Sequence, residues 1–476
     1  MEQSRFARRA LDRRGSAKLR LTAGIFAVCG ALAPAARAQE VDPEPEAEPE
    51  PAPAEEPPAA PPSNASPLVI TGYIDVGFAK AQGDGTSFPT SYGTMPPPGP
   101  ADYYVDGFAP AVNSRGEAAS TTQPPGTTIA GFLPRSAAIA GRPSFLINTA
   151  DVDLRYTAPE LPILIFTRLQ AIPRLYDPDP AENALGGEYT RLVLEQAFGR
   201  ITPLENAELA ISIGKFDSVF GIEYLDNEAN FRVGVTPSLL ARYTTGQSTG
   251  VKVFYRYQII PAASAVSLNV SGTNSGTFVE ALQGPSRSLT GQPVAAARLG
   301  YELNLPRVSL KLGGSVAYGP RNDQSVTTDA TQTLLGADLR LVVPTLVIAG
   351  EYVHVQEENG SDQGFTTIPK LTGTGPYPEI AEFYAHGFWV QAAEELPLPL
   401  DPLPLRVTVY ARYERRHAQF PDYPGAWLTV DRTTAGVNFG VGESLQLKAE
   451  YLINRELAGA PQVPNNVFTS SAVWTW

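Results

Sequence analysis

The stretch VKVFYRYQI, residues 251–259, shows the pattern that decides the fold. Every odd position in it is apolar or aromatic, whereas the even positions include Lys252 and Arg256. Successive side chains of a β-strand point to opposite faces, so this pattern predicts a strand with one apolar face and one charged face. Such a strand separates an apolar environment from a wet one.

The same alternation recurs along the chain from residue 68 onward, for example over 405–414 and 445–453. No stretch in this region has the length of a transmembrane helix. Runs of about 9–13 alternating residues are typical of barrel strands. The pattern predicts sixteen of them, at about 68–80, 146–157, 161–172, 189–200, 207–216, 248–260, 262–270, 294–304, 308–318, 333–344, 345–357, 382–394, 405–416, 429–439, 445–455 and 467–476.

The connections between these runs alternate between long and short. The long gap 81–145 is followed by a tight one at Pro159-Glu160, and the long gap 217–247 by a tight one at Pro261. Membrane barrels have short periplasmic turns and longer extracellular loops, whereas a soluble β-protein with one wet face has no reason to keep that order. Residues 68–476 are therefore predicted to form an all-β, transmembrane antiparallel β-barrel of about sixteen strands.

The first 67 residues predict two segments outside the barrel. Residues 1–38 combine a basic region, a short apolar stretch and Ala36-Arg37-Ala38, the layout of a signal peptide cleaved after Ala38. Cys29, the only cysteine, would leave with it. Residues 39–67 are rich in Pro and Glu and predict a disordered periplasmic linker.

The charge of the chain argues against a nucleic-acid partner. The formal net charge is −13, and the predicted signal peptide holds eight of the 36 basic residues but only two of the 49 acidic ones. Its removal would leave 28 basic residues against 47 acidic ones. Phosphate binding requires a basic surface, which this balance does not favour.

Positive side chains recur on the polar side of the predicted strands. They would face a water-filled lumen, where we expect them both to bias the passage of solutes and to form ion pairs that stiffen the wall. Because surface charge is screened within about 8–10 Å, the lumenal cations give a weak preference for anions despite the acidic chain. The predicted pore-lining residues are Arg168, Arg191, Lys252, Arg256, Arg298, Lys311, Arg340, Arg406, Arg412 and Lys448.

The last predicted strand alternates backwards from an aromatic residue, with Phe468, Trp474 and Trp476 as its aromatic positions. It resembles the C-terminal signal that the barrel-assembly machinery reads, in which the last residue is usually Phe. The machinery is therefore an expected partner, together with the lipid of a bacterial outer membrane.

Catalytic and metal chemistry are not predicted. The histidines are His354, His386 and His417, and their spacing is not that of a metal site. His386 is the one candidate for a general base, although a lone pore or loop histidine is the simpler interpretation. We expect no enzyme activity, no cofactor and no metal ligand.

The segment Gly214-Lys215-Phe216-Asp217-Ser218-Val219-Phe220-Gly221-Ile222-Glu223 resembles the G-x-F-x-x-P-F-G-x-E segment of β-barrel porin families that include the phosphate-selective porins O and P. Val219 stands where those families often have Pro. The resemblance implies passive diffusion of small solutes through a barrel narrowed by an infolded loop. It implies no phosphate selectivity, because the chain lacks a dense lysine ladder. By this analogy the constriction residues are Lys215, Asp217, Glu223, Arg232 and Arg242.

The sequence thus predicts an outer-membrane porin for small hydrophilic solutes or ions, without energy coupling. About sixteen strands give a barrel wide enough for an aqueous channel. The alternative is a structural or adhesion barrel whose long loops bind partners and whose pore is closed. The number of subunits is left open, with a homotrimer among the options.

Overall fold

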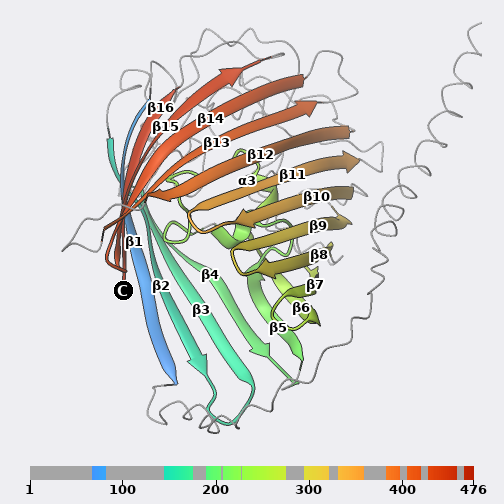
Figure 1. Ribbon diagram of the computed structural model, residues 1–476. Helices are drawn as coiled ribbons and strands as arrows, with labels where there is room; N and C mark the ends of the chain where they lie inside the picture. The colour runs from blue at the N-terminus through green and yellow to red at the C-terminus, as the bar shows by residue number, and fades with distance from the viewer. Residues whose placement is uncertain are drawn as a thin grey trace, which may run out of the picture. The chain divides into compact units, whose positions relative to one another are not determined.

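Sixteen antiparallel strands form one closed barrel in the part of the chain that the computed structural model describes. These residues are 67–81, 144–174, 189–204, 207–226, 228–274, 294–320, 331–358, 382–396, 405–419, 427–457 and 466–476. Each strand pairs with its neighbours in the sequence, and β1 pairs with β16 (Figure 1). The strands are β1 (Leu68–Ala81), β2 (Ser144–Thr157), β3 (Ile163–Arg174), β4 (Tyr189–Ile201), β5 (Glu208–Asp217), β6 (Gln247–Ile260), β7 (Ser264–Thr273), β8 (Val294–Leu305), β9 (Val308–Pro320), β10 (Thr331–Val342), β11 (Leu346–Glu358), β12 (Glu382–Leu396), β13 (Leu405–Gln419), β14 (Trp427–Val441), β15 (Leu445–Glu456) and β16 (Val467–Thr475).

The ends of the barrel differ in the length of their connections. β6 and β7 are separated by residues 261–263, and β14 and β15 by residues 442–444. At the other end, β1 and β2 are separated by residues 82–143, and β5 and β6 by residues 218–246. We call these the short-turn end and the long-loop end.

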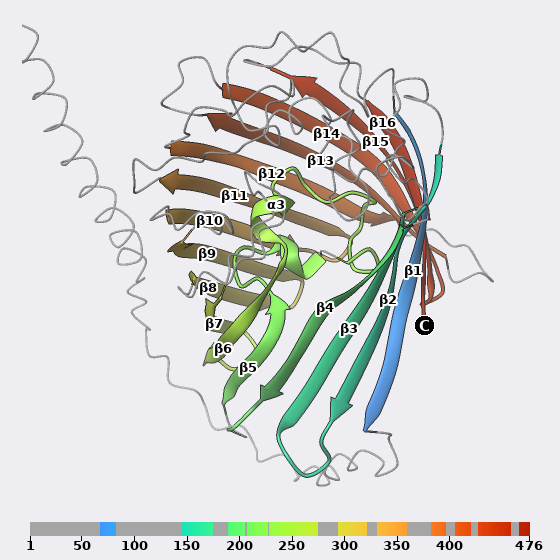
Figure 2. The same ribbon diagram turned by 180° about the vertical axis from the view of Figure 1, so that it is seen from behind.

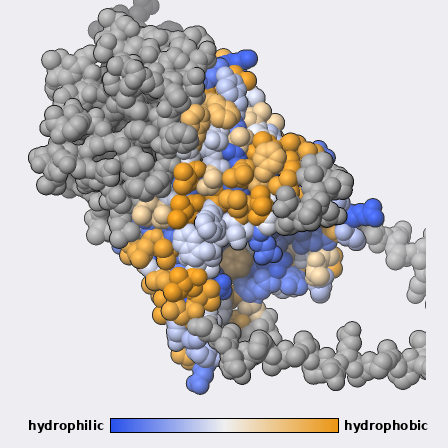
Figure 3. Space-filling model, turned by 90° about the vertical axis from the view of Figure 1, so that its left-hand side faces the viewer, coloured by the Kyte–Doolittle hydropathy of each residue, from blue (hydrophilic) through white to orange (hydrophobic). Residues whose placement is uncertain are grey.

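The two faces of the wall have opposite polarity. Outward residues such as Val251, Tyr257 and Leu299 are exposed, whereas many inward side chains are charged and buried, among them Arg168 and Glu450. Figure 3 shows one side of the barrel, on which apolar residues are common. A closed barrel satisfies all its backbone hydrogen bonds internally, which allows this apolar outer surface to lie in lipid.

The chain between β5 and β6 does not extend away from the barrel. It contains the short helices η3 (Glu223–Asp226) and α3 (Ala241–Thr244), and α3 lies within the ring of strands in both Figure 1 and Figure 2. We call residues 218–246 the inner loop.

The predicted strand number and antiparallel order are confirmed, and the strand bounds differ from the predicted ones by a few residues. For example, β13 continues to Gln419 and β14 begins at Trp427. The predicted signal peptide, almost all of the linker, and the gap 82–143 lie outside the described residues. None of the helices in the described residues has the length and apolar character needed to cross a membrane.

Candidate functional site

The first and last parts of the inner loop pack on an apolar patch of the lumenal wall. Gly336 of β10 and Gly387 of β12 make room for it: an added Cβ would lie 2.7 Å from the Phe220 ring at the first position and 2.7 Å from Leu240 at the second. The cluster buries loop and wall side chains together, namely Phe220, Ile222, Leu240, Tyr243, Ala317, Leu334, Ala349, Val353, Val355, Ala385 and Trp389. Apolar burial therefore fixes the loop against β9–β12.

Residues 235–239 of the inner loop are held by carboxylates of the wall. Glu450 of β15 accepts hydrogen bonds from the backbone N–H groups of Val235 and Thr236, each at 2.9 Å. It also accepts one from the Thr236 hydroxyl at 2.5 Å. Glu414 of β13 accepts from the Leu239 N–H at 2.6 Å. These donors have no secondary-structure partners in this loop, so the carboxylates satisfy backbone groups that burial would otherwise leave unpaired.

Cations of the wall bind the loop carbonyls. Arg412 of β13 donates to the carbonyls of Thr236, at 2.9 Å, and Pro237, at 2.8 Å. Lys448 of β15 donates to the carbonyl of Arg232 at 2.5 Å and also contacts the carbonyl of Ala229. The wall thus supplies acceptors for the backbone N–H groups of the loop and donors for its backbone carbonyls.

Glu228 connects the loop to the opposite part of the wall. It accepts a hydrogen bond from the Tyr73 hydroxyl of β1 at 2.6 Å and forms an ion pair with Arg168 of β3 at 2.8 Å. Asp151 and Glu195 lie beside it, with carboxylate oxygens of all three residues within 4.8 Å of one another. The inner loop therefore contacts β1 and β3 as well as β9–β15, and it crosses the lumen.

Glu223 organises the loop from within. Its carboxylate accepts hydrogen bonds from the Ser238 N–H at 2.6 Å and from the Ser238 hydroxyl at 2.5 Å. Burial raises the pKa of the Glu223 carboxyl above its usual range, and the two Ser238 donors offset part of that rise. Burial also raises the pKa of Asp226, which Arg340 partly counteracts.

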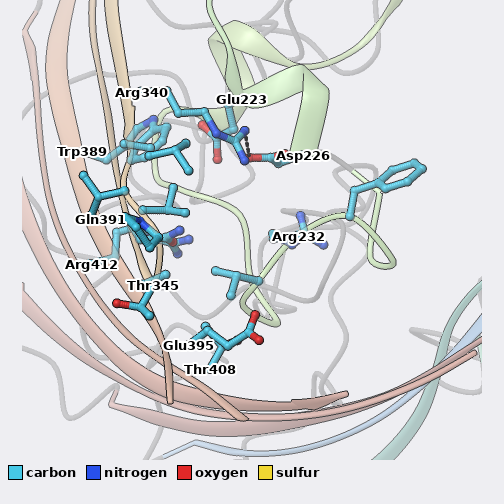
Figure 4. Close-up of a pocket in the computed structure, with 18 residues that line it drawn as sticks. Glu223, Asp226, Arg232, Arg340, Thr345, Trp389, Gln391, Glu395, Thr408 and Arg412 are labelled. Atoms are coloured by element: carbon cyan, nitrogen blue, oxygen red, sulfur yellow. Dashed lines mark hydrogen bonds and ion pairs between the residues drawn. The ribbon is translucent and has the colours of Figure 1, made fainter. Parts of the chain in front are cut away.

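A cavity of about 310 Å³ lies between the inner loop and the wall formed by β10–β13 (Figure 4). Its charged lining includes three carboxylates, Glu223, Asp226 and Glu395, and three guanidinium groups, which belong to Arg232, Arg340 and Arg412. Arg340 contacts Asp226 at 3.5 Å. The lining also includes Val343 and Thr345, which connect β10 to β11 at the short-turn end.

The structure brings together only some of the predicted constriction residues. Glu223 and Arg232 both line this cavity. Asp217 ends β5, where it accepts a hydrogen bond from Gln196 at 2.8 Å. Lys215 donates to the Leu194 carbonyl at 2.7 Å and shares the strand face of the outward residue Ile213, so its position does not favour a role in the lumen. The side chain of Arg242 lies outside the described residues.

Most of the predicted pore-lining cations form interactions within the barrel. Arg168 pairs with Asp153, Arg256 with Glu208 and Glu302, Lys311 with Glu302, Arg298 with Asp338, and Arg412 with Glu414. The Lys252 ammonium lies 4.7 Å from the centre of the Phe216 ring. Arg406 is exposed, and the side chain of Arg191 is outside the described residues. Ion pairs between residues of the wall thus account for five of the ten predicted residues.

The aromatic residues of the last strand lie on or near the seam of the barrel. Phe468 and Trp474 are exposed on the outer face, and the Phe468 ring is 6.2 Å from that of Phe78 of β1. Trp476 exchanges two backbone hydrogen bonds with Gly72 of β1, at 3.0 and 3.2 Å.

Sequence reasoning missed the wall residues that hold the inner loop, above all Glu414, Glu450 and Lys448 in that role. Their inward position follows from strand alternation, but their partners lie more than 170 residues away in the chain. The available signal was the pair of inward glycines, Gly336 and Gly387, where an added Cβ would meet Phe220 and Leu240 of the inner loop.

No protein-family model and no curated protein match the chain. Among solved structures it is similar to OmpF of Salmonella typhi, with a TM-score of 0.48, 10% identity and coverage of 86% of this chain and 97% of that one. It is also similar to an anion-selective porin from Comamonas acidovorans (TM-score 0.46, 7% identity, 86% and 99% coverage) and to OmpT of Vibrio cholerae in its trimer form (TM-score 0.44, 11% identity, 86% and 99% coverage). At these values the likeness concerns the general form of the barrel and carries no argument about what this chain transports.

Proposed function

We propose that the chain is an outer-membrane channel through which small hydrophilic solutes or ions diffuse passively, with the inner loop as its constriction. The observation that carries this proposal is a charged lumen, partly filled by the inner loop, inside a closed barrel whose outer face is apolar. Sixteen-stranded barrels enclose more space than side chains alone can fill. The reaction class is transport down a gradient, and no catalytic step is invoked.

The lumenal charges support a channel with little preference for ion sign. The cavity beside the loop has three carboxylates and three guanidinium groups in its lining. The cations elsewhere on the inner wall are largely paired with acids or with loop carbonyls. The weak anion preference expected from the sequence is therefore not part of this proposal.

A barrel with a closed pore is the second candidate, and the inner loop itself favours it. This loop is hydrogen-bonded to β13 and β15 on one side and to β1 and β3 on the other. A segment held at so many points could act as a plug, in which case the long loops would carry an interaction function.

Conductance of the purified protein in planar lipid bilayers separates the two candidates. Glu450→Ala leaves the Val235 and Thr236 donors without their acceptor, at a cost of roughly 1–3 kcal/mol for each. We expect stepwise openings from the wild type and larger or noisier steps from Glu450→Ala. The matched control is Glu443→Ala, in the exposed turn before β15, which should conduct like the wild type.

The remaining outcomes decide against the channel in different ways. If the wild type is silent and Glu450→Ala conducts, the inner loop is a plug and the second candidate holds. If neither protein conducts although both are folded in detergent, the channel proposal is wrong.

A further inference from the structure

The chain contains three histidines, and the structure places all of them in one row across three neighbouring strands. His354 of β11 is directly opposite His386 of β12, and His386 is directly opposite His417 of β13. The sequence spacing predicted no such grouping, because pairing between antiparallel strands joins residues that are about thirty positions apart here.

This histidine row lies on the outer face of the barrel. Tyr352 and Val390, which share its strand faces, are 44% and 48% exposed. The alternate residues Val353 and Ala385 are fully buried against the inner loop. His354 lies four residues before the end of β11, and His386 four residues after the start of β12, so the row is near the long-loop end. The neighbouring row on the side away from this end holds the aromatic residues Tyr352 and Phe388, whereas the row on the other side begins with Gln356, so the histidines lie at the edge of the apolar band.

The imidazoles are close enough to share a ligand. The ring centres of His386 and His417 are 5.1 Å apart, with an angle of 44° between the planes. Adjacent strands are about 4.8 Å apart, which puts the Cα atoms of the two outer histidines roughly 10 Å apart with the third between them. Rotation of three side chains about their own bonds can then turn one nitrogen of each ring towards a common point.

One member of the row already has the second contact that metal-binding histidines usually make. His417 Nδ1 lies 2.8 Å from the Thr429 hydroxyl of β14, the next residue in the same row. Such a contact to one ring nitrogen fixes the ring and leaves Nε2 for a metal. Asp431 of β14 accepts hydrogen bonds from Arg415 at 2.7 Å and from Tyr413 at 2.8 Å, so the charges of Asp431 and Arg415 neutralise each other.

We propose that His354, His386 and His417 form a surface site for a transition-metal ion such as Zn²⁺ or Cu²⁺. Three imidazole nitrogens are the donors of a zinc site with one position left for water or another ligand. Imidazole favours Zn²⁺, Cu²⁺ and Ni²⁺ over Mg²⁺ and Ca²⁺, which require oxygen donors. The site is on the outer wall, so it is independent of conduction through the lumen.

The carboxylates Asp151, Glu195 and Glu228 are the competing group for a cation inside the barrel. They are already bound by Arg168 and by donors such as the Gln170 amide, which lies 3.0 Å from Glu195 and 3.3 Å from Asp151. Nothing at that cluster indicates a metal ion beyond the acids themselves. The two sites differ in donor atoms, so a spectroscopic probe of ligand type distinguishes them.

The test is Cu²⁺ titration of the detergent-folded protein without a histidine tag, followed by electron paramagnetic resonance. Because the chain has only three histidines, hyperfine coupling to imidazole nitrogen identifies the row. We expect one ion per chain with nitrogen coupling, and the same stoichiometry for Zn²⁺ by calorimetry. His386→Ala should abolish the coupling, and either His354→Ala or His417→Ala should weaken binding about 10-fold or more.

Four further variants define the specificity of the result. Thr429→Val should weaken binding about 10-fold, with recovery in Thr429→Ser, if the hydroxyl positions His417. Gln356→Ala, one row further out on β11, and Glu228→Gln, in the inner acidic group, should bind like the wild type. The proposal is overturned by the absence of binding, by oxygen coordination alone, or by binding that His386→Ala leaves unchanged.

Discussion

Glu223 shows how one buried carboxylate couples the position of the inner loop to pH. Its pKa is raised in the docked loop by burial, whereas in a detached loop the carboxyl would have its ordinary pKa. Between these two values the docked loop holds more protons, so docking is favoured at low pH and weakens as the pH rises through the raised pKa. Asp226 has a pKa shifted in the same direction and adds to this dependence.

Glu223→Gln should therefore keep the loop docked and reduce its pH dependence. A glutamine amide can accept from the Ser238 N–H and donate to its hydroxyl, which replaces the contacts of the carboxylate without a buried charge. Hydrogen exchange of the Ser238 and Leu240 amides, corrected for intrinsic rates, measures docking. Protection should fall with rising pH in the wild type and in the exposed control Glu443→Gln, and fall less in Glu223→Gln. Equal slopes in all three would mean that Glu223 does not control docking.

At the scale of the element, Trp476 extends the contact between β1 and β16 beyond their last paired residues. The backbone N–H and carbonyl of Trp476 both form hydrogen bonds with the backbone of Gly72. The Trp476 ring lies where a side chain at position 72 would be, so it packs directly on Gly72. Trp476 is 48% exposed, so truncation to Ala removes a partly buried ring, worth about 1–2 kcal/mol.

We therefore expect Trp476→Ala to reduce the yield of folded barrel and Trp476→Phe to preserve most of it. Folded barrels migrate differently from unfolded chains on unheated gels, which gives the folded fraction directly. Phe439→Ala on the outer face of β14, where Phe439 is 37% exposed, controls for the loss of any partly exposed aromatic ring. If both Ala variants fold equally well, the seam does not depend on Trp476.

The strands were predictable from the sequence and the contacts between distant elements were not. Alternation is a local pattern, and it identified β6 and β13 because one face must meet lipid and the other water. The contact between Val235 and Glu450 joins residues 215 positions apart. It depends on how far the inner loop reaches across the lumen, and the lumen takes its shape only when the sheet closes into a barrel. The histidine row is a similar case, since it depends on the register of two strand pairs.

For the whole molecule, the charge of the cavity matters more for selectivity than the net charge of the chain. The net charge of −13 is spread over a long chain, and exposed charges are screened beyond about 8 Å at physiological salt. On the proposed path beside the inner loop, ions would meet Arg340 and Glu395, whose opposite charges line the same cavity. Opposite charges so placed nearly cancel at the centre of the path.

The reversal potential in a salt gradient tests this balance. We expect a value near zero for the wild type, because neither sign dominates the cavity lining. Arg340→Gln leaves Asp226 without its ion-pair partner and should raise the cation-to-anion permeability ratio roughly twofold, the effect of about 0.4 kcal/mol. Glu395→Gln should lower the ratio by a similar factor, and both shifts should shrink at high salt as screening increases. If both variants shift the ratio in the same direction, or neither shifts it, ions do not pass through this cavity, and the path beside the inner loop must lie along another part of the wall.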